Sequence, residues 1–228
     1  MQQPFYVKYL TVTNHLTYTM DDEDKDPNFA TVDSGNKLVD GYFETAHYLD
    51  QAVQQFYDYL KKSGLYDKSI IVLYGDHYGI SGSDNKAFAP YVGYNGATLN
   101  SYDTTMLQRT PFMVDIPGQT SGHIINTYVG QLDVMPTLEH LLGIDTKKYV
   151  QFGQDMFASG RQDFVALRNG GFVTPTITQP SLNGSFYDTQ TGLQIEKLNA
   201  QQDQYVKETK QKVSDLLKAS DKLNNQNL

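Results

Sequence analysis

An Asp-His pair follows the most apolar strand-like run of the sequence and is flanked by glycines. The run covers residues 69–74, and after it come Gly75, Asp76, His77 and Gly79. A carboxylate oxygen with an imidazole nitrogen suits a divalent cation such as Mn²⁺ or Zn²⁺, and glycine lets the backbone turn sharply. Ligands of open α/β sheets bind at the carboxyl ends of strands. Two interpretations follow: metal ligation by Asp76 and His77, or a tight turn in which Asp76 caps backbone amides and His77 is simply exposed.

A second histidine ends another predicted strand. Residues 4–13 are rich in aromatic and β-branched side chains, which predicts a strand that delivers Asn14 and His15. Considered by itself, His15 is best explained as a histidine at a strand end whose ring nitrogens have ordinary hydrogen-bond partners. Two strands that each deliver a histidine at the carboxyl end favour a site assembled across a sheet. The other histidines are better explained as packing, surface or loop residues: His47, His123 and His140.

The elements around these residues predict an α/β fold. Apolar positions over 42–62 alternate by four and three, which predicts a helix that stops at Gly64. The nearly continuous apolar run 69–74 then predicts a strand buried on both faces of a parallel sheet. Helix followed by buried strand is a unit of a layered α/β fold. We expect a long irregular loop over 79–103, a loop over 21–27, a strand over 110–116, and a short helix from Asp133 to Leu142.

The composition changes after about residue 150. Short strands separated by Gly and Asn turns predict an antiparallel patch over 164–168, 172–174 and 185–187, and a final helix follows over 201–223. We therefore expect a larger α/β domain over 1–150 and a small α+β subdomain with a carboxyl-terminal helix over 151–228.

Composition excludes several classes of protein. The 228 residues carry 18 Lys and Arg against 26 Asp and Glu, a formal net charge of −8, which argues against a nucleic-acid partner. Cysteine is absent, which excludes disulfides, thiolate metal sites and cysteine nucleophiles. No apolar run approaches the roughly 18–20 residues that a membrane span needs. Because a predicted strand begins almost at Met1, we expect an upstream portion of the protein.

The two histidine segments resemble the lipoteichoic acid synthases, which are polyglycerolphosphate synthases of the sulfatase and alkaline-phosphatase superfamily. The resemblance rests on Tyr74-Gly75-Asp76-His77-Tyr78-Gly79-Ile80-Ser81 and on Thr11-Val12-Thr13-Asn14-His15, with support from Thr110-Pro111-Phe112 and the stretch 131–138. It runs from about residue 4 to 192. It implies the carboxyl-terminal half of a layered catalytic domain on the extracellular face of a Gram-positive membrane, tethered by upstream transmembrane helices.

The resemblance also implies roles for individual residues. Asp76 and His77 look like two metal ligands, usually of Mn²⁺ in that family, with Mg²⁺ or Zn²⁺ as alternatives. His15 resembles a histidine that contacts the glycerol-phosphate group, and Ser81 resembles the hydroxyl beside it. The implied reaction moves glycerol phosphate from phosphatidylglycerol onto a growing polymer.

The sequence departs from that family at the nucleophile. The family's threonine nucleophile and a further acidic ligand come before the Asn-His segment, so we expect both upstream and expect this chain alone to be inactive and to bind metal poorly. Two alternatives stay open: a sulfatase or phosphatase of the same superfamily that uses water as acceptor, or a non-catalytic module that binds wall polymer or a partner protein.

Overall fold

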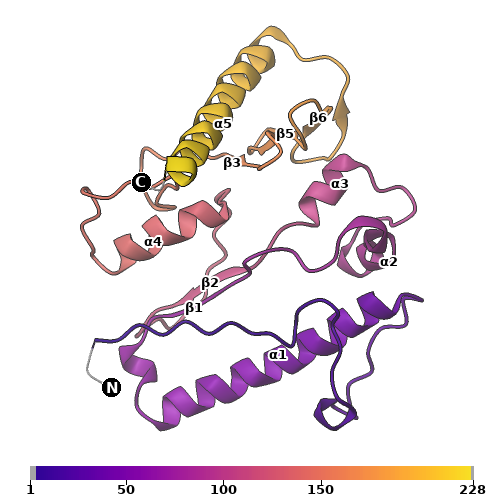
Figure 1. Cartoon of the computed structure of the whole chain (residues 1–228), viewed down its shortest axis with the longest axis vertical. Coiled ribbons are helices and arrows are strands. Elements are labelled where there is room, and N and C mark those ends of the chain that lie inside the picture. Colours follow the sequence, from indigo (N-terminus) through magenta and orange to yellow (C-terminus); the bar gives the residue numbers. More distant parts are fainter. Residues whose placement is uncertain (1–3, 227–228) are drawn as a thin grey trace. The chain divides into compact units, whose positions relative to one another are not determined.

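The structure, a computed structural model, describes residues 4–226 and divides the chain into two compact units (Figure 1). Unit 1 comprises the residues up to Asn100 together with Met106–Gly122, and unit 2 comprises Ser101–Thr105 together with the residues from His123 onward. Each unit has a hydrophobic core of its own. The expected domain boundary near residue 150 stays a prediction, since a compact unit need not be an independent domain.

Unit 1 contains the long helix α1 (Lys37–Lys62). The helix begins earlier than its apolar periodicity predicts, because the Asn36 side chain accepts hydrogen bonds from the N–H groups of Leu38 and Val39 at 3.0 and 3.3 Å. Its end agrees with the predicted stop, since Gly64 has a positive φ of 72°.

Two of the three predicted strands of unit 1 pair with each other. β1 (Ile71–Tyr74) and β2 (Phe112–Asp115) are antiparallel, with Ile71 opposite Asp115. The prediction of a parallel sheet buried on both faces is therefore wrong for this pair, and Leu73 and Met113 are exposed. The apolar run specifies a strand, but the direction of its partner depends on contacts distant in sequence.

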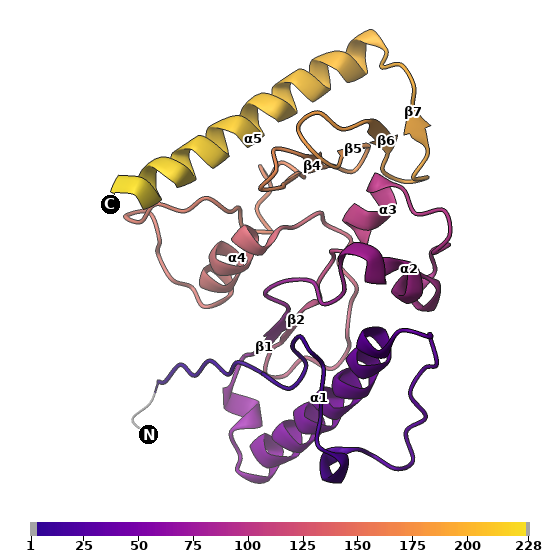
Figure 2. The same cartoon turned by 45° about the vertical axis from the view of Figure 1, so that its right-hand side comes forward.

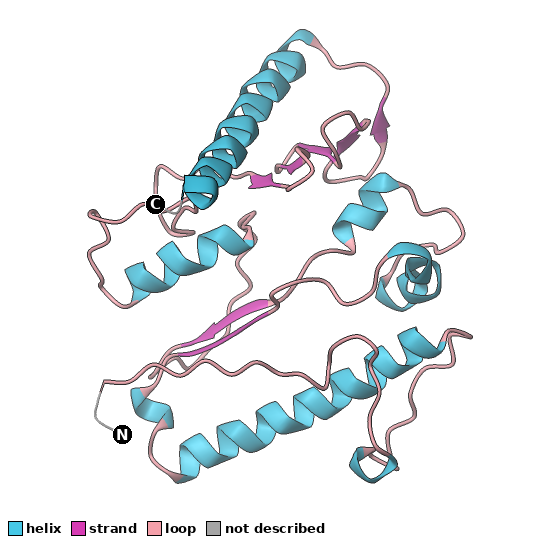
Figure 3. Ribbon diagram, in the orientation of Figure 1, coloured by secondary structure: helices cyan, strands magenta, loops and turns pink. Residues whose placement is uncertain are grey.

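Residues 4–13 have no regular secondary structure, so the predicted strand is absent (Figure 3). A strand needs a neighbour for its N–H and C=O groups, and none of the described strands pairs with this segment. The segment instead passes along α1, where the rings of Tyr9 and Phe56 lie edge to face with centroids 5.7 Å apart.

The predicted loop over 79–103 contains more helix than expected. It holds η3 (Gly82–Asp84), α2 (Asn85–Phe88), η4 (Ala89–Val92) and the start of α3 (Ser101–Met106). Two further 3-10 turns are η1 (Asp22–Asp24), within the predicted loop 21–27, and η2 (Tyr66–Lys68). None of the described helices is both long and apolar enough to cross a membrane.

Unit 2 contains an antiparallel sheet covered by α5 (Ala200–Gln226) (Figure 2). Val206 and Val213 of the helix form a core with Phe172 and Ile177 of the sheet. The predicted antiparallel patch and final helix are confirmed, whereas two strands, β5 and β7, escaped prediction. The sheet follows chain order: β3 (Val165–Ala166), β4 (Phe172–Val173), β5 (Ile177–Gln179), β6 (Phe186–Asp188) and β7 (Gln194–Ile195). The chain therefore has the expected α/β class with a small antiparallel subdomain.

The short helix of unit 2 is also present, as η5 (Gln131–Asp133) followed by α4 (Val134–Leu141). Asp133 precedes α4 as expected but does not cap it through its side chain. Its carboxylate instead accepts hydrogen bonds from the N–H groups of Gly130 and Gln154 at 2.9 and 2.7 Å.

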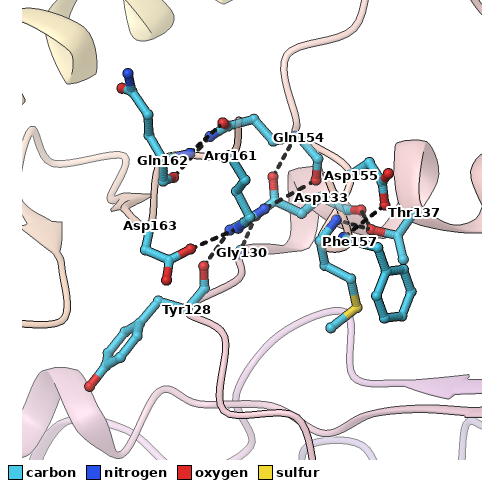
Figure 4. Close-up of polar contacts among 11 residues, drawn as sticks. Tyr128, Gly130, Asp133, Thr137, Gln154, Asp155, Phe157, Arg161, Gln162 and Asp163 are labelled. Carbon is cyan, nitrogen blue, oxygen red and sulfur yellow. Dashed lines mark hydrogen bonds and ion pairs between the residues drawn. The ribbon is translucent and has the colours of Figure 1, made fainter. Parts of the chain in front are cut away.

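A buried ion pair joins Asp133 to Arg161, and Figure 4 shows the surrounding contacts. The two side chains are 9% and 3% exposed, and their nearest charged atoms lie 3.0 Å apart. The Arg161 guanidinium also donates to the Asp163 carboxylate at 3.0 Å and to the carbonyls of Tyr128 and Gln154. With its donors so engaged, the guanidinium fixes the chain around residues 128–163, a stretch that contributes no buried residue to either of the described hydrophobic cores.

We predict that Asp133→Ala destabilises unit 2 by about 3–5 kcal/mol. The change leaves the buried Arg161 charge with only the more exposed Asp163 as an ionic partner, and it leaves the N–H groups of Gly130 and Gln154 without their acceptor. The free energy of unfolding from urea titrations measures this loss. The matched control is Asp221→Ala, which breaks the exposed pair with Arg168 at 2.7 Å and is expected to cost no more than about 1 kcal/mol. Equal losses in the two variants would contradict the argument.

The acidic segment before α1 is attached to that helix through Asp26. The Asp26 carboxylate lies 3.0 Å from His47 Nε2 and accepts a hydrogen bond from Gln51, also at 3.0 Å. The ring of Phe29 stacks on His47 with centroids 4.0 Å apart and planes 4° apart. The hydrogen bond with His47 lowers the pKa of Asp26 from its ordinary value of 3.8.

This attachment predicts a pH dependence of stability. A lowered pKa in the folded state means that the Asp26 contribution is complete above pH 3.8 and is lost as the pH falls through the lowered value. We expect Asp26→Asn to remove this part of the acid sensitivity, measured as the free energy of unfolding from about pH 5 to about pH 2. Asp24→Asn is the control. Parallel stability curves for the wild type and Asp26→Asn would contradict the prediction.

Candidate functional site

Asp76 and His77 lie together just beyond the end of β1. Asp76 Oδ1 is 3.7 Å from His77 Nε2, and the two side chains are 72% and 55% exposed. His77 Nδ1 lies 2.9 Å from the carbonyl oxygen of Tyr78. Because a carbonyl only accepts, Nδ1 carries a proton, and in the neutral ring Nε2 is an acceptor on the side of the carboxylate. Metal-binding histidines are typically held in this way, by a hydrogen bond from the other ring nitrogen.

His15 lies next to His77, although the strand predicted to deliver it is absent. The two imidazole rings are edge to face, with centroids 5.7 Å apart and planes at 81°. His15 Nδ1 lies 3.0 Å from the carbonyl of Leu16, so this Nδ1 also carries a proton, and in the neutral ring Nε2 is an acceptor. The structure therefore brings together three of the four predicted site residues, Asp76, His77 and His15.

Ser81 is the fourth predicted site residue. It lies at the N-terminal end of η3, is exposed, and makes no capping hydrogen bond through its hydroxyl. Its hydroxyl is therefore accessible, but its role beside a phosphate stays a prediction.

Two hydrogen bonds hold the His15 turn in place. Asn14 accepts one from the buried hydroxyl of Thr45 on α1 at 3.0 Å. The N–H of Tyr18 donates to the His15 carbonyl at 2.7 Å and closes the turn. Thr45 and Tyr18 escaped prediction because neither carries a local motif, and only the folded chain shows what they contact.

Gly79 permits the close packing of the segment after His77 against α1. A Cβ atom at Gly79 would lie 2.5 Å from Cε2 of Tyr42 and 3.1 Å from the Tyr18 hydroxyl. The neighbouring core of unit 1 consists of Tyr18, Val39 and Ile80, packed against further apolar side chains. The glycine therefore serves close approach as well as the sharp turn that the sequence predicts.

The donor set available to a cation is small. Within residues 4–226, no group of three or more His, Asp and Glu side chains is arranged to hold a metal ion. Asp76 and His77 supply one oxygen and one nitrogen, a mixed pair that suits a divalent cation of intermediate softness. The pair fits such an ion chemically, and it leaves most of the coordination shell to other ligands.

Comparison with known proteins identifies the family. The family model described as Sulfatase matches residues 1–144, a stretch that includes His15, Asp76, His77 and Ser81. The chain belongs to the sulfatase family.

Curated relatives show which members of the sulfatase family the chain is similar to. It is 45% identical to lipoteichoic acid synthase 2 of Bacillus subtilis over 86% of its own length and 29% of that protein's length. It is 44% identical to lipoteichoic acid synthase 1 of the same organism, covering 97% of this chain and 33% of the relative. The chain is 42% identical to lipoteichoic acid synthase of Staphylococcus aureus, over 98% of this chain and 33% of the relative. The chain thus spans about a third of the curated relatives it matches.

Solved structures agree with the fold. The lipoteichoic acid synthase LtaP from Listeria monocytogenes matches with a TM-score of 0.76 and 27% identity, covering 94% of this chain and 52% of that one. A protein of the alkaline phosphatase superfamily from Vibrio parahaemolyticus matches with a TM-score of 0.61 at 17% identity, covering 95% and 48%. At that identity, the second match supports the fold alone.

The close packing at Gly79 yields a prediction. We expect Gly79→Ala to lower the free energy of unfolding by about 1–3 kcal/mol, because the new Cβ must displace the Tyr42 ring. Gly122→Ala, with no atom within 4 Å of the added Cβ, should change it by less than about 0.5 kcal/mol. Chemical denaturation of both variants checks this, and an unaffected Gly79→Ala protein would contradict the packing argument.

Proposed function

We propose that this chain is part of a metal-dependent phosphoglycerol transferase that builds the polyglycerolphosphate of lipoteichoic acid from phosphatidylglycerol. The observation that carries the proposal is the cluster of Asp76, His77 and His15 in a chain 42–45% identical to lipoteichoic acid synthases over most of its length.

The metal is proposed to be Mn²⁺, held by Asp76 Oδ1 and His77 Nε2 together with ligands from outside these 228 residues. The sulfatase and alkaline-phosphatase superfamily is generally metal-dependent. A bound divalent cation supplies Lewis acidity that neutralises charge on a phosphate and lowers the pKa of a coordinated hydroxyl. The Tyr78 carbonyl keeps the Nδ1 proton of His77 in place and so maintains Nε2 as the ligand atom.

His15 and Ser81 are proposed to bind the glycerol-phosphate group. His15 Nε2 is an acceptor in the neutral ring, so it can take a hydrogen bond from a glycerol hydroxyl or receive a proton during transfer. The exposed Ser81 hydroxyl can donate to a phosphate oxygen. Both groups orient the substrate, while the covalent step requires a nucleophile, which we propose is a threonine in a preceding segment.

The proposed setting is the extracellular face of a Gram-positive membrane. The complete protein would be tethered upstream, where phosphatidylglycerol is within reach, and the growing glycerol phosphate polymer would be its product. The preceding segment would supply the nucleophile and the remaining acidic ligand, so the 228 residues alone are proposed to be inactive.

Two substitutions in the complete protein test the roles. Asp76→Ala should lower Mn²⁺ affinity by more than about 100-fold. Substitutions of residues that only support the metal ligands typically lower metal affinity by about 10–100-fold, and the loss of a direct ligand should exceed that. Polymer synthesis should fall together with the Mn²⁺ affinity. His15→Ala should abolish polymer synthesis while Mn²⁺ binding, measured by calorimetric titration, stays unchanged. His140→Ala, an exposed histidine paired with Asp155 in unit 2, is the control and should alter neither.

The outcomes distinguish the alternatives. Loss of metal in His15→Ala would move His15 into the ligand set. Release of free glycerol phosphate or sulfate without polymer would indicate a hydrolase of the same superfamily. Affinity for glycerol phosphate that survives metal removal, with no turnover, would indicate a binding module.

A further inference from the structure

Tyr18 connects the two histidine segments physically. It lies three residues after His15, and its hydroxyl donates a hydrogen bond of 2.8 Å to the carbonyl of Gly79, two residues after His77. Because its own N–H is bonded to the His15 carbonyl at 2.7 Å, a short path of covalent and hydrogen bonds joins one imidazole to the other.

The conformation of Tyr18 is unusual for a residue with a side chain. Its φ is +55°, and it is the one non-glycine residue with a positive φ among the described residues. L-residues with bulky side chains rarely adopt this region, and such outliers persist only where surrounding contacts enforce them. The turn therefore has to be held by what the Tyr18 side chain contacts.

Those contacts come from α1 and from the segment after His77. The ring is 4% exposed and lies edge to face on Tyr42, with centroids 5.2 Å apart. A Cβ at Gly41 would lie 3.3 Å from the Tyr18 Cβ and closer still to its carbonyl oxygen, so the helix backbone passes directly behind the turn. Burial raises the pKa of the Tyr18 phenol, which keeps its hydroxyl available as a donor.

We propose that Tyr18 is a positioning residue that sets the distance between His15 and His77. This inference rests on the proposed function, in which one histidine holds substrate and the other holds metal. Asp76 and His77 come from one turn and keep their own geometry, so the contact from Tyr18 governs where the substrate-binding histidine lies relative to the metal ligands.

The test removes the hydroxyl alone. Tyr18→Phe in the complete protein should lower kcat for polymer synthesis by about 10–100-fold, since a displacement of about 1 Å has effects of this size. The Mn²⁺ dissociation constant should stay within about twofold of the wild type, because both proposed ligands precede the bonded carbonyl.

Tyr42→Phe is the matched control. It removes a hydroxyl from the ring that touches Tyr18, and within the described part of the chain the Tyr42 hydroxyl makes no hydrogen bond. Tyr42→Phe should therefore keep wild-type kcat. A similar loss of kcat in both variants would assign the effect to general packing and overturn the proposal.

A spectroscopic readout separates this inference from the proposed function. In protein labelled at histidine side chains, NMR should show the imidazole signals of His15 and His77 shifted in Tyr18→Phe, while those of His140 stay in place. Unshifted His15 and His77 signals would overturn the positioning role. Shifted signals in a protein whose wild type makes no polymer would support the positioning role and reject the proposed function.

Discussion

The close approach of α1 to the turn at Tyr18 is the constraint on which the candidate site depends. Gly41 lets the helix backbone lie against the Tyr18 carbonyl, and Gly79 lets the segment after His77 lie against the Tyr42 ring. These two close approaches bring the Tyr18 hydroxyl within 2.8 Å of the Gly79 carbonyl oxygen, to which it donates a hydrogen bond. Since His15 belongs to none of the described strands, its place beside His77 follows from these contacts together with the Thr45–Asn14 and Tyr18–His15 hydrogen bonds.

The part of unit 2 around residues 128–163 is ordered by a different physical means. Around Asp133 and Arg161 the chain is held by a buried ion pair whose remaining donors and acceptors are engaged with backbone groups and with the Asp163 carboxylate. The motif-like stretch 131–138 thus has a structural explanation: Asp133 binds Arg161 and backbone N–H groups, and the Thr137 hydroxyl donates to the Asp133 carbonyl at 2.6 Å. Such a pair fixes the geometry of the surrounding chain more reliably than it adds net stability, because the cost of removing both charges from water offsets much of their attraction.

What the sequence predicts well here is local. The helices at 37–62, 134–141 and 200–226 lie close to the ranges that local sequence patterns such as apolar periodicity and the stop at Gly64 predict, and the Asp76-His77 turn follows from a strand flanked by glycines. What it predicts poorly depends on distant partners. The segment 4–13 has strand-like residues but no neighbour among the described strands, β1 pairs antiparallel, and β5 and β7 form where adjacent strands supply partners for their backbone groups. Tyr18 belongs to this second group, since its role comes from Gly79, 61 positions away.

The exposure of the candidate site fits its incomplete donor set. An ion held by Asp76 and His77 alone would keep most of its shell as water, and both side chains are more than half exposed. Tight binding of divalent ions requires further protein ligands with fixed orientation. The apolar side chains Leu73, Tyr74 and Met113 on the adjoining strands are exposed as well, although burial of such groups ordinarily stabilises a sheet. The proposed metal ligands and these exposed apolar side chains thus lie at the same end of the β1–β2 pair, in a chain that spans about a third of its curated relatives.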